Sequence, residues 1–565
     1  MRNRKEESIN NAVSVKKVLI PLMAILILAS CCFLMPAVSE AGAEGVIMPT
    51  VLNPNYRIQA LLPKTLGSGF NGLAFDSQDN LYVGCVLDST TYRVNKETGA
   101  VSVFIPPPEG MSDDLVFEPG GRVIWNAFFL GKVFAKGADG KIVTLVENLP
   151  GVNGIDLSKD GRLFVSQCYL ADALWEIDRS GQQKNRKIAE RLGGLNAFRV
   201  HTDGYLYGPL VFKSQVVRIN VNTGEVKVVA DGFKTPQAVK FDSRGNLFVI
   251  DNKTGELVRV DVKTGEKKVV AIVEHHLDNL AIDSQDRIFI SSNGSSSIFE
   301  VNEKTGKVRT VVKGRLASPQ GIAVWNSPQG DILFVADNFA YKRVDGFTGN
   351  TQESTKGGAF PNAASIAGEK VLMSGWFRNV VEVFDAKTDD LLYGIPGFKT
   401  VTGMLMLPDE SILVAEAGTG SILRVRDKEG KQREVVAKDL ALPVYMAPAG
   451  PDAVYVTEFL AGRVTKVDLK TGDKKVIASG LRNPKGIAVK PDGTILVVNV
   501  GTKELLQIEP ASGVVKPFVA NLPIGLFVPQ GFMPAFTLNG VAISKSGNIY
   551  FTSDIENVIY KVSPK

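Results

Sequence analysis

A unit of about 41 residues recurs along this chain, and no other feature of the sequence constrains the fold as strongly. The segment VDVKTGEKKVV begins at Val260, and the nearly identical VDLKTGDKKVI begins at Val467. Twelve short apolar segments open the successive units, among them NGLAF at Asn71, NGIDL at Asn153 and KGIAV at Lys485. Ten of the eleven spacings between these openings lie between 40 and 43 residues, and the last is 54. Such repetition predicts one structural unit built many times.

Each unit has the pattern of four short antiparallel strands. The opening strand runs into a polar turn such as DSRGN or KPDGT, and a second strand such as LFVID or ILVVN follows. A third strand, a KTG or NTG turn and a fourth strand complete the unit. Four-stranded units of this length are typical of β-propeller blades, and a ring closes with about four to eight of them. The sequence therefore predicts an all-β fold: two six-bladed β-propellers after an N-terminal signal or anchor segment.

The repeats also set the expected domain boundaries. Residues 1–43 are a signal peptide or membrane anchor, and residues 44–69 are a linker with a candidate blade-closing strand. The first propeller spans residues 70–318 and the second spans residues 319–565. The twelfth unit stops after its third strand, and NYRIQALLPK at residues 55–64 reads as the missing fourth strand. If it completes the last blade, either the second ring contains this N-terminal strand or the two rings divide the blades differently.

The N-terminus indicates export. Residues 18–38 carry no charge and follow the basic pair Lys16 and Lys17, which is typical of an export signal or a single membrane anchor. The segment LASC, which ends at Cys31, resembles a bacterial lipobox and would give a lipoprotein, whereas AGA at residues 41–43 fits ordinary signal cleavage. Lipoprotein, uncleaved anchor and secreted protein thus remain open. All three place the body of the protein on the periplasmic or extracellular side, and the first two attach it to the membrane.

The charge and the cysteines exclude several classes of function. The formal net charge is +5, and five basic and two acidic residues in the first 30 positions account for +3 of it. No nucleic acid is expected as a partner, because nucleic-acid-binding domains concentrate basic residues on one face. Cys85 and Cys168 lie 83 residues apart and fit no metal or redox spacing, so we expect small buried apolar residues. No phosphate-binding loop, dinucleotide-binding turn or nucleophile elbow is recognisable.

The first residue of each opening strand is expected near the mouth of a propeller channel, and we call these residues the channel positions. In the first six repeats they are Asn71, Asp113, Asn153, Asn196, Gln237 and Asp278. In the last six they are Gln320, Asn362, Thr402, Val444, Lys485 and Asn539. Six converging oxygen-bearing side chains with two carboxylates suit a hard divalent cation, Ca²⁺ foremost, and the lack of His and Cys argues against zinc. The alternative interpretation is turn chemistry, because Asn and Asp before Gly are favoured in turns.

Three segments, NPKGIAVKPDGTILVVN, PQAVKFDSRGNLFVID and VNGIDLSKDGRLFVSQ, resemble NHL repeats and the propellers of the regucalcin and gluconolactonase (senescence-marker) family. Streptogramin-lyase-like propellers are similar, and the resemblance covers nearly all of residues 70–565. It implies a channel in which carboxylate and asparagine ligands hold a divalent cation, as in the family's lactonases. Asn153 matches the family's asparagine motif. However, Asn71 stands where the family has a glutamate, and Asn196 stands where it has a ligand aspartate.

Two functions follow from these observations. The first is an exported, membrane-associated module that binds a small-molecule ligand or a protein partner on a propeller face, which the incomplete set of acids favours. The alternative is a divalent-metal-dependent hydrolase of the gluconolactonase type that acts on a lactone or ester. Its cation would be held by Asn71, Asp113, Asn153, Asn196 and Asp278. The sequence leaves open whether the protein is an enzyme, although His275 and His276 precede Asp278 and offer a general base.

Overall fold

The computed structural model describes residues 48–180, 184–354, 360–529 and 537–565. The predicted export segment at residues 18–38, the lipobox cysteine Cys31 and the cleavage motif at residues 41–43 lie outside these residues. None of the helices in the described ranges combines the length and hydropathy needed to cross a bilayer. Cys85 and Cys168 are both free and buried, as the sequence predicted.

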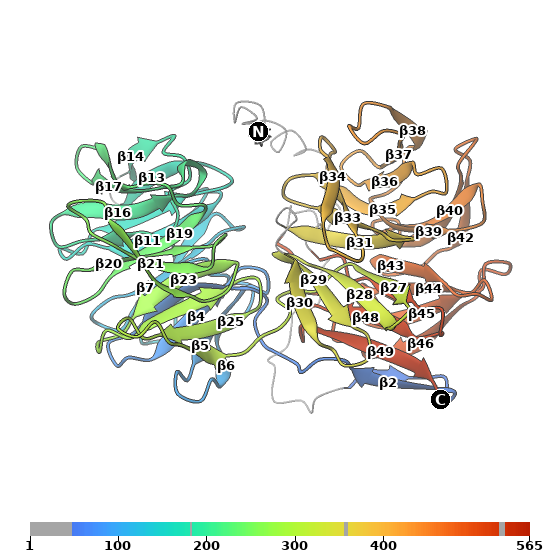
Figure 1. Ribbon diagram of the computed structural model, residues 1–565, viewed down its shortest axis with the longest axis horizontal. Coiled ribbons are helices and arrows are strands. Elements are labelled where there is room, and N and C mark those ends of the chain that lie inside the picture. Colours follow the sequence, from blue (N-terminus) through green and yellow to red (C-terminus); the bar gives the residue numbers. More distant parts are fainter. Residues whose placement is uncertain (1–47, 181–183, 355–359, 530–536) are drawn as a thin grey trace, which may run out of the picture. The chain divides into compact units, whose positions relative to one another are not determined.

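The described chain forms twelve antiparallel sheets, arranged as two six-bladed propellers (Figure 1). Six sheets of four strands each form the first propeller: β3 (Phe70–Phe75), β4 (Leu81–Cys85), β5 (Thr90–Val94), β6 (Val101–Ile105); β7 (Leu115–Phe117), β8 (Val123–Ala127), β9 (Lys132–Lys136), β10 (Ile142–Val146); β11 (Val152–Leu157), β12 (Leu163–Gln167), β13 (Ala173–Ile177), β14 (Arg186–Glu190); β15 (Arg199–Val200), β16 (Tyr205–Leu210), β17 (Gln215–Asn220), β18 (Val226–Ala230); β19 (Pro236–Phe241), β20 (Leu247–Asp251), β21 (Glu256–Val260), β22 (Lys267–Ile272); and β23 (Leu277–Ile282), β24 (Ile288–Ser292), β25 (Ser297–Val301), β26 (Val308–Val312). A 3-10 turn, η2 (Val211–Lys213), joins β16 to β17.

The second propeller begins with four sheets built in the same way: β27 (Ile322–Ser327), β28 (Gly330–Asp337), β29 (Ala340–Asp345), β30 (Thr351–Ser354); β31 (Pro361–Ala367), β32 (Lys370–Gly375), β33 (Val380–Asp385), β34 (Leu391–Ile395); β35 (Val401–Met406), β36 (Ile412–Glu416), β37 (Ser421–Val425), β38 (Arg433–Ala437); and β39 (Pro443–Pro448), β40 (Ala453–Glu458), β41 (Arg463–Asp468), β42 (Lys474–Ala478). Its last two sheets contain β43 (Pro484–Val489), β44 (Ile495–Asn499), β45 (Glu504–Ile508), β46 (Val515–Ala520), and β47 (Val541–Ile543), β48 (Ile549–Ser553), β49 (Val558–Pro564), with the 3-10 turn η3 (Val500–Thr502) between β44 and β45.

The N-terminal strands belong to these last two sheets. β2 (Tyr56–Ala60) pairs antiparallel with β49, with Ile58 opposite Val562, and thereby supplies the fourth strand of the twelfth blade (Figure 1). β1 (Thr50–Val51) pairs with β46 and gives the eleventh blade a fifth strand, which the sequence did not predict. The whole first propeller is therefore inserted between two pieces of the second.

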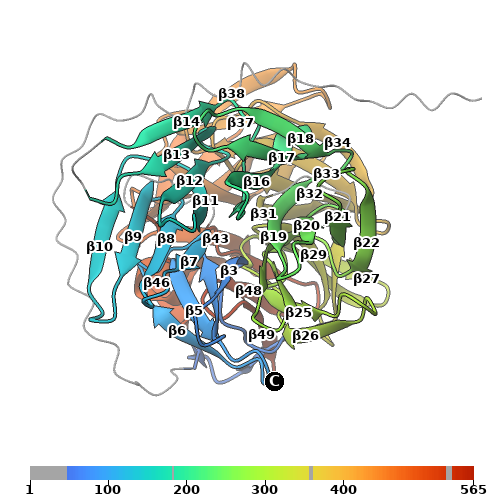
Figure 2. The ribbon, with the colours of Figure 1, turned by 90° about the vertical axis from the view of Figure 1, so that its left-hand side faces the viewer.

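The two rings close differently. In the second ring, the N-terminal strand β2 pairs with the C-terminal strand β49, and β27 packs against β47. In the first ring, which Figure 2 shows face on, every blade consists of four consecutive strands, and β23 simply packs against β3. Apolar residues from both sides fill this seam, including Phe70 and Leu73 of the first blade and Phe289 and Ile298 of the sixth. The first ring thus closes by side-chain packing without strand exchange.

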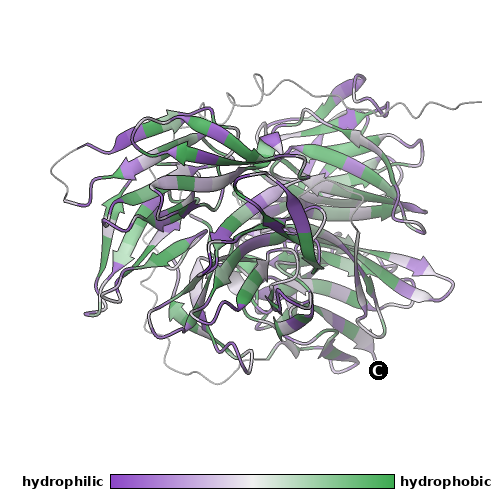
Figure 3. Cartoon of the chain, turned by 60° about the vertical axis from the view of Figure 1, so that its left-hand side comes forward, coloured by the Kyte–Doolittle hydropathy of each residue, from purple (hydrophilic) through white to green (hydrophobic). Residues whose placement is uncertain are grey.

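Apolar alternation along the strands builds the core between successive blades. Val133 of the second blade, for example, shares one buried cluster with Val152 and Ile155 of the third. The inner strands are apolar, whereas the turns and outer strands carry most of the polar residues (Figure 3). Sheets with one buried edge and one solvated edge produce this pattern.

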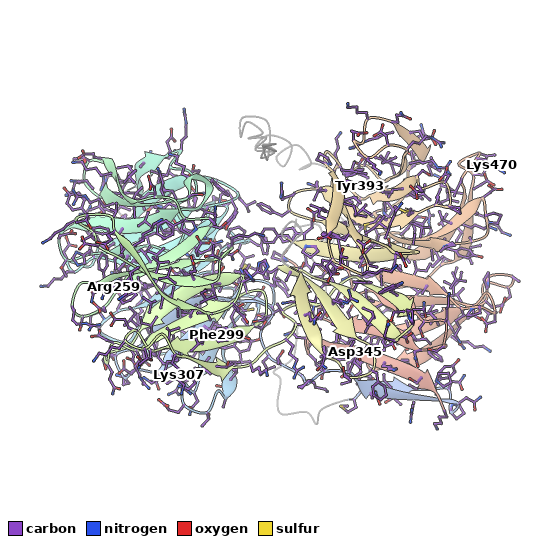
Figure 4. All side chains as sticks on the ribbon, viewed as in Figure 1. Arg259, Phe299, Lys307, Asp345, Tyr393 and Lys470 are labelled. Carbon is purple, nitrogen blue, oxygen red and sulfur yellow. The ribbon has the colours of Figure 1, made fainter. Side chains whose placement is uncertain are left out.

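The two similar eleven-residue segments are the hairpins between the third and fourth strands of the fifth and tenth blades. In each hairpin an aspartate closes the turn: Asp261 Oδ1 accepts hydrogen bonds from the backbone N–H groups of Lys263 (2.8 Å) and Thr264 (2.9 Å), and Asp468 does the same at its turn. Lys307 and Lys470, from turns of this type, lie at the outer edges of their propellers (Figure 4). The repetition therefore reflects local turn chemistry at the solvated rim.

A glycine follows the channel position in six of the repeats, and the structure gives these glycines a role other than turn formation. A Cβ atom at Gly72 would lie 2.5 Å from the carbonyl oxygen of Asp113, and one at Gly154 would lie 2.7 Å from that of Asn196. Both glycines lie inside strands, and both carbonyl groups belong to the next blade. Glycine is needed here because neighbouring blades approach each other closely around the channel.

Candidate functional site

One cavity, with a volume of about 480 Å³, gathers all six channel positions of the first propeller. These residues are separated by about 40 positions each in the chain, and the ring brings them together because every blade contributes its inner strand to the channel. The five residues predicted as metal ligands, Asn71, Asp113, Asn153, Asn196 and Asp278, are all among the lining residues.

Two carboxylates lie in this cavity and are held by asparagine amides. Asp113 accepts a hydrogen bond of 2.6 Å from Nδ2 of Asn153. Asp278 accepts one of 2.9 Å from Nδ2 of Asn293 and a longer one of 3.4 Å from Nδ2 of Asn71. Asn71 lies on the first blade and Asp278 on the sixth, so their contact crosses the seam that closes the ring.

A third acid lies close to these two. Asp114 is buried, and its Oδ1 accepts a hydrogen bond of 3.2 Å from Nδ2 of Asn279. Burial raises the pKa of Asp278 to about 7 and that of Asp114 to about 6. Burial and the negative charges of Asp278 and Asp114 raise the pKa of Asp113 well above its usual range. The repeat pattern does not indicate Asp114, because this residue follows a channel position and is not itself the first residue of an opening strand.

The family resemblance implies a divalent cation held by these side chains. Nδ2 of Asn71 faces Asp278, and its Oδ1 accepts a hydrogen bond of 3.0 Å from the backbone N–H of Val86. Asn196 donates to Oε1 of Gln237, while its Oδ1 accepts from the backbone of Ala197 (2.8 Å). Within the described residues, no group of three or more His, Cys, Asp or Glu side chains could hold a metal ion. Ca²⁺ takes six to eight oxygen ligands, so this arrangement, in which amide N–H groups face the carboxylates, does not fit it.

Aromatic side chains form another wall of the cavity, and they come from both propellers. Phe128, Phe129, Tyr169 and Phe212 come from the first, and Phe339, Phe360, Trp376 and Phe377 come from the second. The rings form a continuous network: the ring centroids of Phe129 and Trp376 are 6.3 Å apart, and those of Tyr169 and Phe377 are 5.8 Å apart. This wall could not be predicted from one repeat, because its two halves lie more than 120 positions apart in the sequence.

Basic groups stand at the edge of the cavity. Lys253 and Arg378 line it with exposed side chains, and His276 lines it while partly buried. The neighbouring His275 is exposed, and its Nδ1 lies 2.8 Å from the carbonyl oxygen of Lys253. Of the two histidines named as candidate bases, only His276 therefore lines the cavity.

The channel positions of the second propeller are also buried, but their chemistry differs. Lys485 replaces the acids of the first ring, and its Nζ donates a hydrogen bond of 3.1 Å to Oγ1 of Thr537. Burial lowers the pKa of Lys485 to about 8. None of the six channel residues of this ring lines the 480 Å³ cavity.

Comparison with known proteins gives similarity of fold. A family model described as a repeat of unknown function (DUF6923) matches residues 140–272, which is less than half of the chain. No curated protein matches the sequence significantly.

Among solved structures, virginiamycin B lyase from Staphylococcus aureus is 14% identical over 50% of this chain and 96% of its own, with a TM-score of 0.36. A gluconolactonase from Xanthomonas campestris is 15% identical over 43% of this chain and 92% of its own, with a TM-score of 0.37. The extracellular domain of a hybrid two-component system protein from B. thetaiotaomicron is 10% identical over 90% of this chain and 83% of its own, with a TM-score of 0.32. At these values the similarities carry no information about activity.

Proposed function

We propose that this protein is an exported module that binds a small molecule in the cavity of the first propeller. The observation that carries the proposal is the cavity itself, in which six polar channel residues face a wall of aromatic rings. A volume of about 480 Å³ lies in the range of small-molecule sites, which combine apolar walls with a few polar groups. The uncharged segment at residues 18–38 supports export and membrane attachment.

A variant that fills the cavity tests this proposal. Val211 lines the cavity and is nearly buried, so Val211→Trp is expected to occupy ligand volume, whereas Val228→Trp lies on the exposed outer strand β18. In a thermal-shift screen of chemically diverse small molecules, we expect compounds that stabilise the wild type and Val228→Trp but not Val211→Trp. The proposal is contradicted if no compound stabilises the wild type, or if Val211→Trp responds like the wild type.

A divalent-metal-dependent hydrolase acting on a lactone or ester is the second candidate. The observation in its favour is that Asp113 and Asp278 share one cavity, where burial and the charge of Asp278 raise the pKa of Asp113. This candidate is second because the Nδ2 groups of Asn153 and Asn71 face the carboxylates where a metal ion would need oxygen ligands.

Calorimetric titration of the chelator-treated protein with Ca²⁺, Mn²⁺ and Zn²⁺ decides between the two candidates. Because the amides are engaged with the carboxylates, we expect binding of each ion no tighter than about 1 mM, the weak end of known calcium sites. Micromolar binding that disappears in the Asp113→Ala, Asp278→Ala variant would instead establish the metal site and make the hydrolase the leading candidate.

A further inference from the structure

Asp113 and Asp278 form one side of the cavity, which we call its floor. Within the described residues, neither Asp113 nor Asp278 forms a salt bridge with a basic side chain. Asp114 is a third acid nearby, and the positive charge of Lys240 compensates it in part. Burying carboxylates without a positive partner is costly, so they take up a proton or attract a cation. An occupant with a positive charge would remove this cost.

The polar groups of the floor are hydrogen-bond acceptors, so they favour a ligand that donates hydrogen bonds. The carboxylate oxygens of Asp113 and Asp278 accept bonds from asparagine amides on one side. Asn293 also lines the cavity, and its Oδ1 atom is buried with no hydrogen-bond partner among the described residues. An ammonium group carries three N–H donors and no acceptor, so it matches this small set of acceptors. A divalent metal ion would need about twice as many oxygens.

The aromatic wall supports the same choice of occupant. Aromatic faces attract organic cations within about 6 Å of the ring centroid, and they pack well against an apolar body. Trp376 and Phe377 both line the cavity, with ring centroids 5.8 Å apart and nearly perpendicular planes. Aromatic rings offer no oxygen ligands to a strongly hydrated metal ion, so they do not favour such an ion.

We propose that the occupant is an organic monocation, an amine whose ammonium group lies at Asp113 and Asp278 and whose apolar body lies against the aromatic wall. This inference rests on the proposed ligand-binding function and names its ligand class. The exposed Lys253 and Arg378 at the edge of the cavity would repel a second positive charge on the far end of the ligand. A polyamine is therefore a poorer ligand than an amine with its charge at one end.

Three probes of nearly the same shape isolate the contribution of charge: phenethylamine, 2-phenylethanol and 3-phenylpropanoate. In calorimetric titrations of the full chain at pH 8, phenethylamine is expected to bind at least tenfold more tightly than 2-phenylethanol. The anionic 3-phenylpropanoate is expected to bind more weakly than either. Equal or tighter binding of the alcohol or of the anion would overturn the inference while leaving a ligand cavity in place. Absence of binding by all three probes would also overturn it, and the broader screen would then judge the proposed function separately.

Two matched variants test whether Asp113 and Asp278 are responsible for the preference for phenethylamine. Asp113→Asn, Asp278→Asn is expected to weaken phenethylamine binding at least tenfold and to leave 2-phenylethanol binding unchanged. Asp283 is a buried acid on the same blade as Asp278, but it pairs with Lys96 outside the cavity. Asp283→Asn is therefore expected to leave phenethylamine binding unchanged. Full phenethylamine affinity in the double variant would contradict the proposal.

A pH comparison on the wild type keeps the test valid if the double variant does not fold. The ligand's ammonium group stays protonated between pH 5 and pH 8, whereas the cavity acids take up protons as the pH falls. Phenethylamine affinity is therefore expected to fall at least fivefold from pH 8 to pH 5, while 2-phenylethanol affinity stays constant. The other titratable or charged groups that line the cavity are His276, Lys253, Arg378 and Tyr169. A constant phenethylamine affinity would overturn the inference.

Discussion

Deletion of residues 48–60 is expected to lower the melting temperature of the second propeller by about 10 °C or more. The deletion removes β1 and β2, so β49 becomes an unpaired edge and the ring loses the strand that joins its two ends. Five residue pairs connect β2 to β49, and ladder hydrogen bonds contribute about 1 kcal/mol each, which gives several kcal/mol. A change of this size shifts the melting temperature of a domain of this length by about 2–4 °C per kcal/mol.

Hydrogen exchange locates the effect, and a pair of substitutions in β2 controls for the deletion. Amide exchange in β47–β49 is expected to accelerate, whereas exchange in β23–β26 of the first ring is expected to change little. Ile58 packs against the apolar core of the second ring, and the neighbouring Gln59 is exposed. Ile58→Asp should therefore reproduce part of the destabilisation, and Gln59→Asp should not. If the truncated chain kept the exchange pattern of a chain beginning at Met48, the closing role of β2 would be wrong.

Replacement of both cavity acids, Asp113→Asn with Asp278→Asn, is expected to stabilise the ligand-free protein at pH 8. The pKa of Asp278 is raised from 3.8 to about 7 by burial, so the folded protein holds a proton that the unfolded chain releases. Stability from this group is fully present below about pH 4 and is lost as the pH rises through 7. The loss at pH 8 is on the order of 2–4 kcal/mol for the wild type.

Denaturant unfolding at pH 5 and pH 8 measures this effect. The wild type is expected to lose stability between the two values, and the double variant is expected to lose much less. Asp283→Asn provides a control of opposite sign, because Asp283 is buried and yet hydrogen bonds from Arg287 and Lys96 hold its pKa below the usual value. That variant should be destabilised at pH 8. Equal slopes with pH for the wild type and the double variant would contradict the prediction.

The two rings of this chain are closed by different kinds of contact. The second ring gains stability from a hydrogen-bonded strand at its closure, whereas the first ring closes through packing and through polar contacts such as the 2.6 Å bond from Ser291 Oγ to the carbonyl oxygen of Asn71. The cavity lies at the mouth of the ring that closes without strand exchange, and Asn71 and Asp278 connect its first and last blades.

Much of the architecture could be predicted from the sequence. The period of about 41 residues, the alternation within strands and the Asp- and Gly-containing turns predicted twelve blades in two rings, and the structure has them. The channel positions were found in the same way, because a residue at a fixed place in each repeat must occupy the same place in each blade. The role of the glycines after these positions was missed, since the sequence cannot show that the next blade lies 2.5 Å from where a Cβ would be.

The sequence by itself determined the blade, because strand alternation and turn chemistry act between residues that are near each other in the chain. Only the tertiary structure decided that β2 closes the second ring, that the first ring is inserted into the second, and that Phe129 meets Trp376. It also decided that the asparagines turn their amide N–H groups toward Asp113 and Asp278. The physical reason is that similar repeats carry the same local preferences, so ring closure and the chemistry of the cavity depend on contacts between residues far apart in the chain.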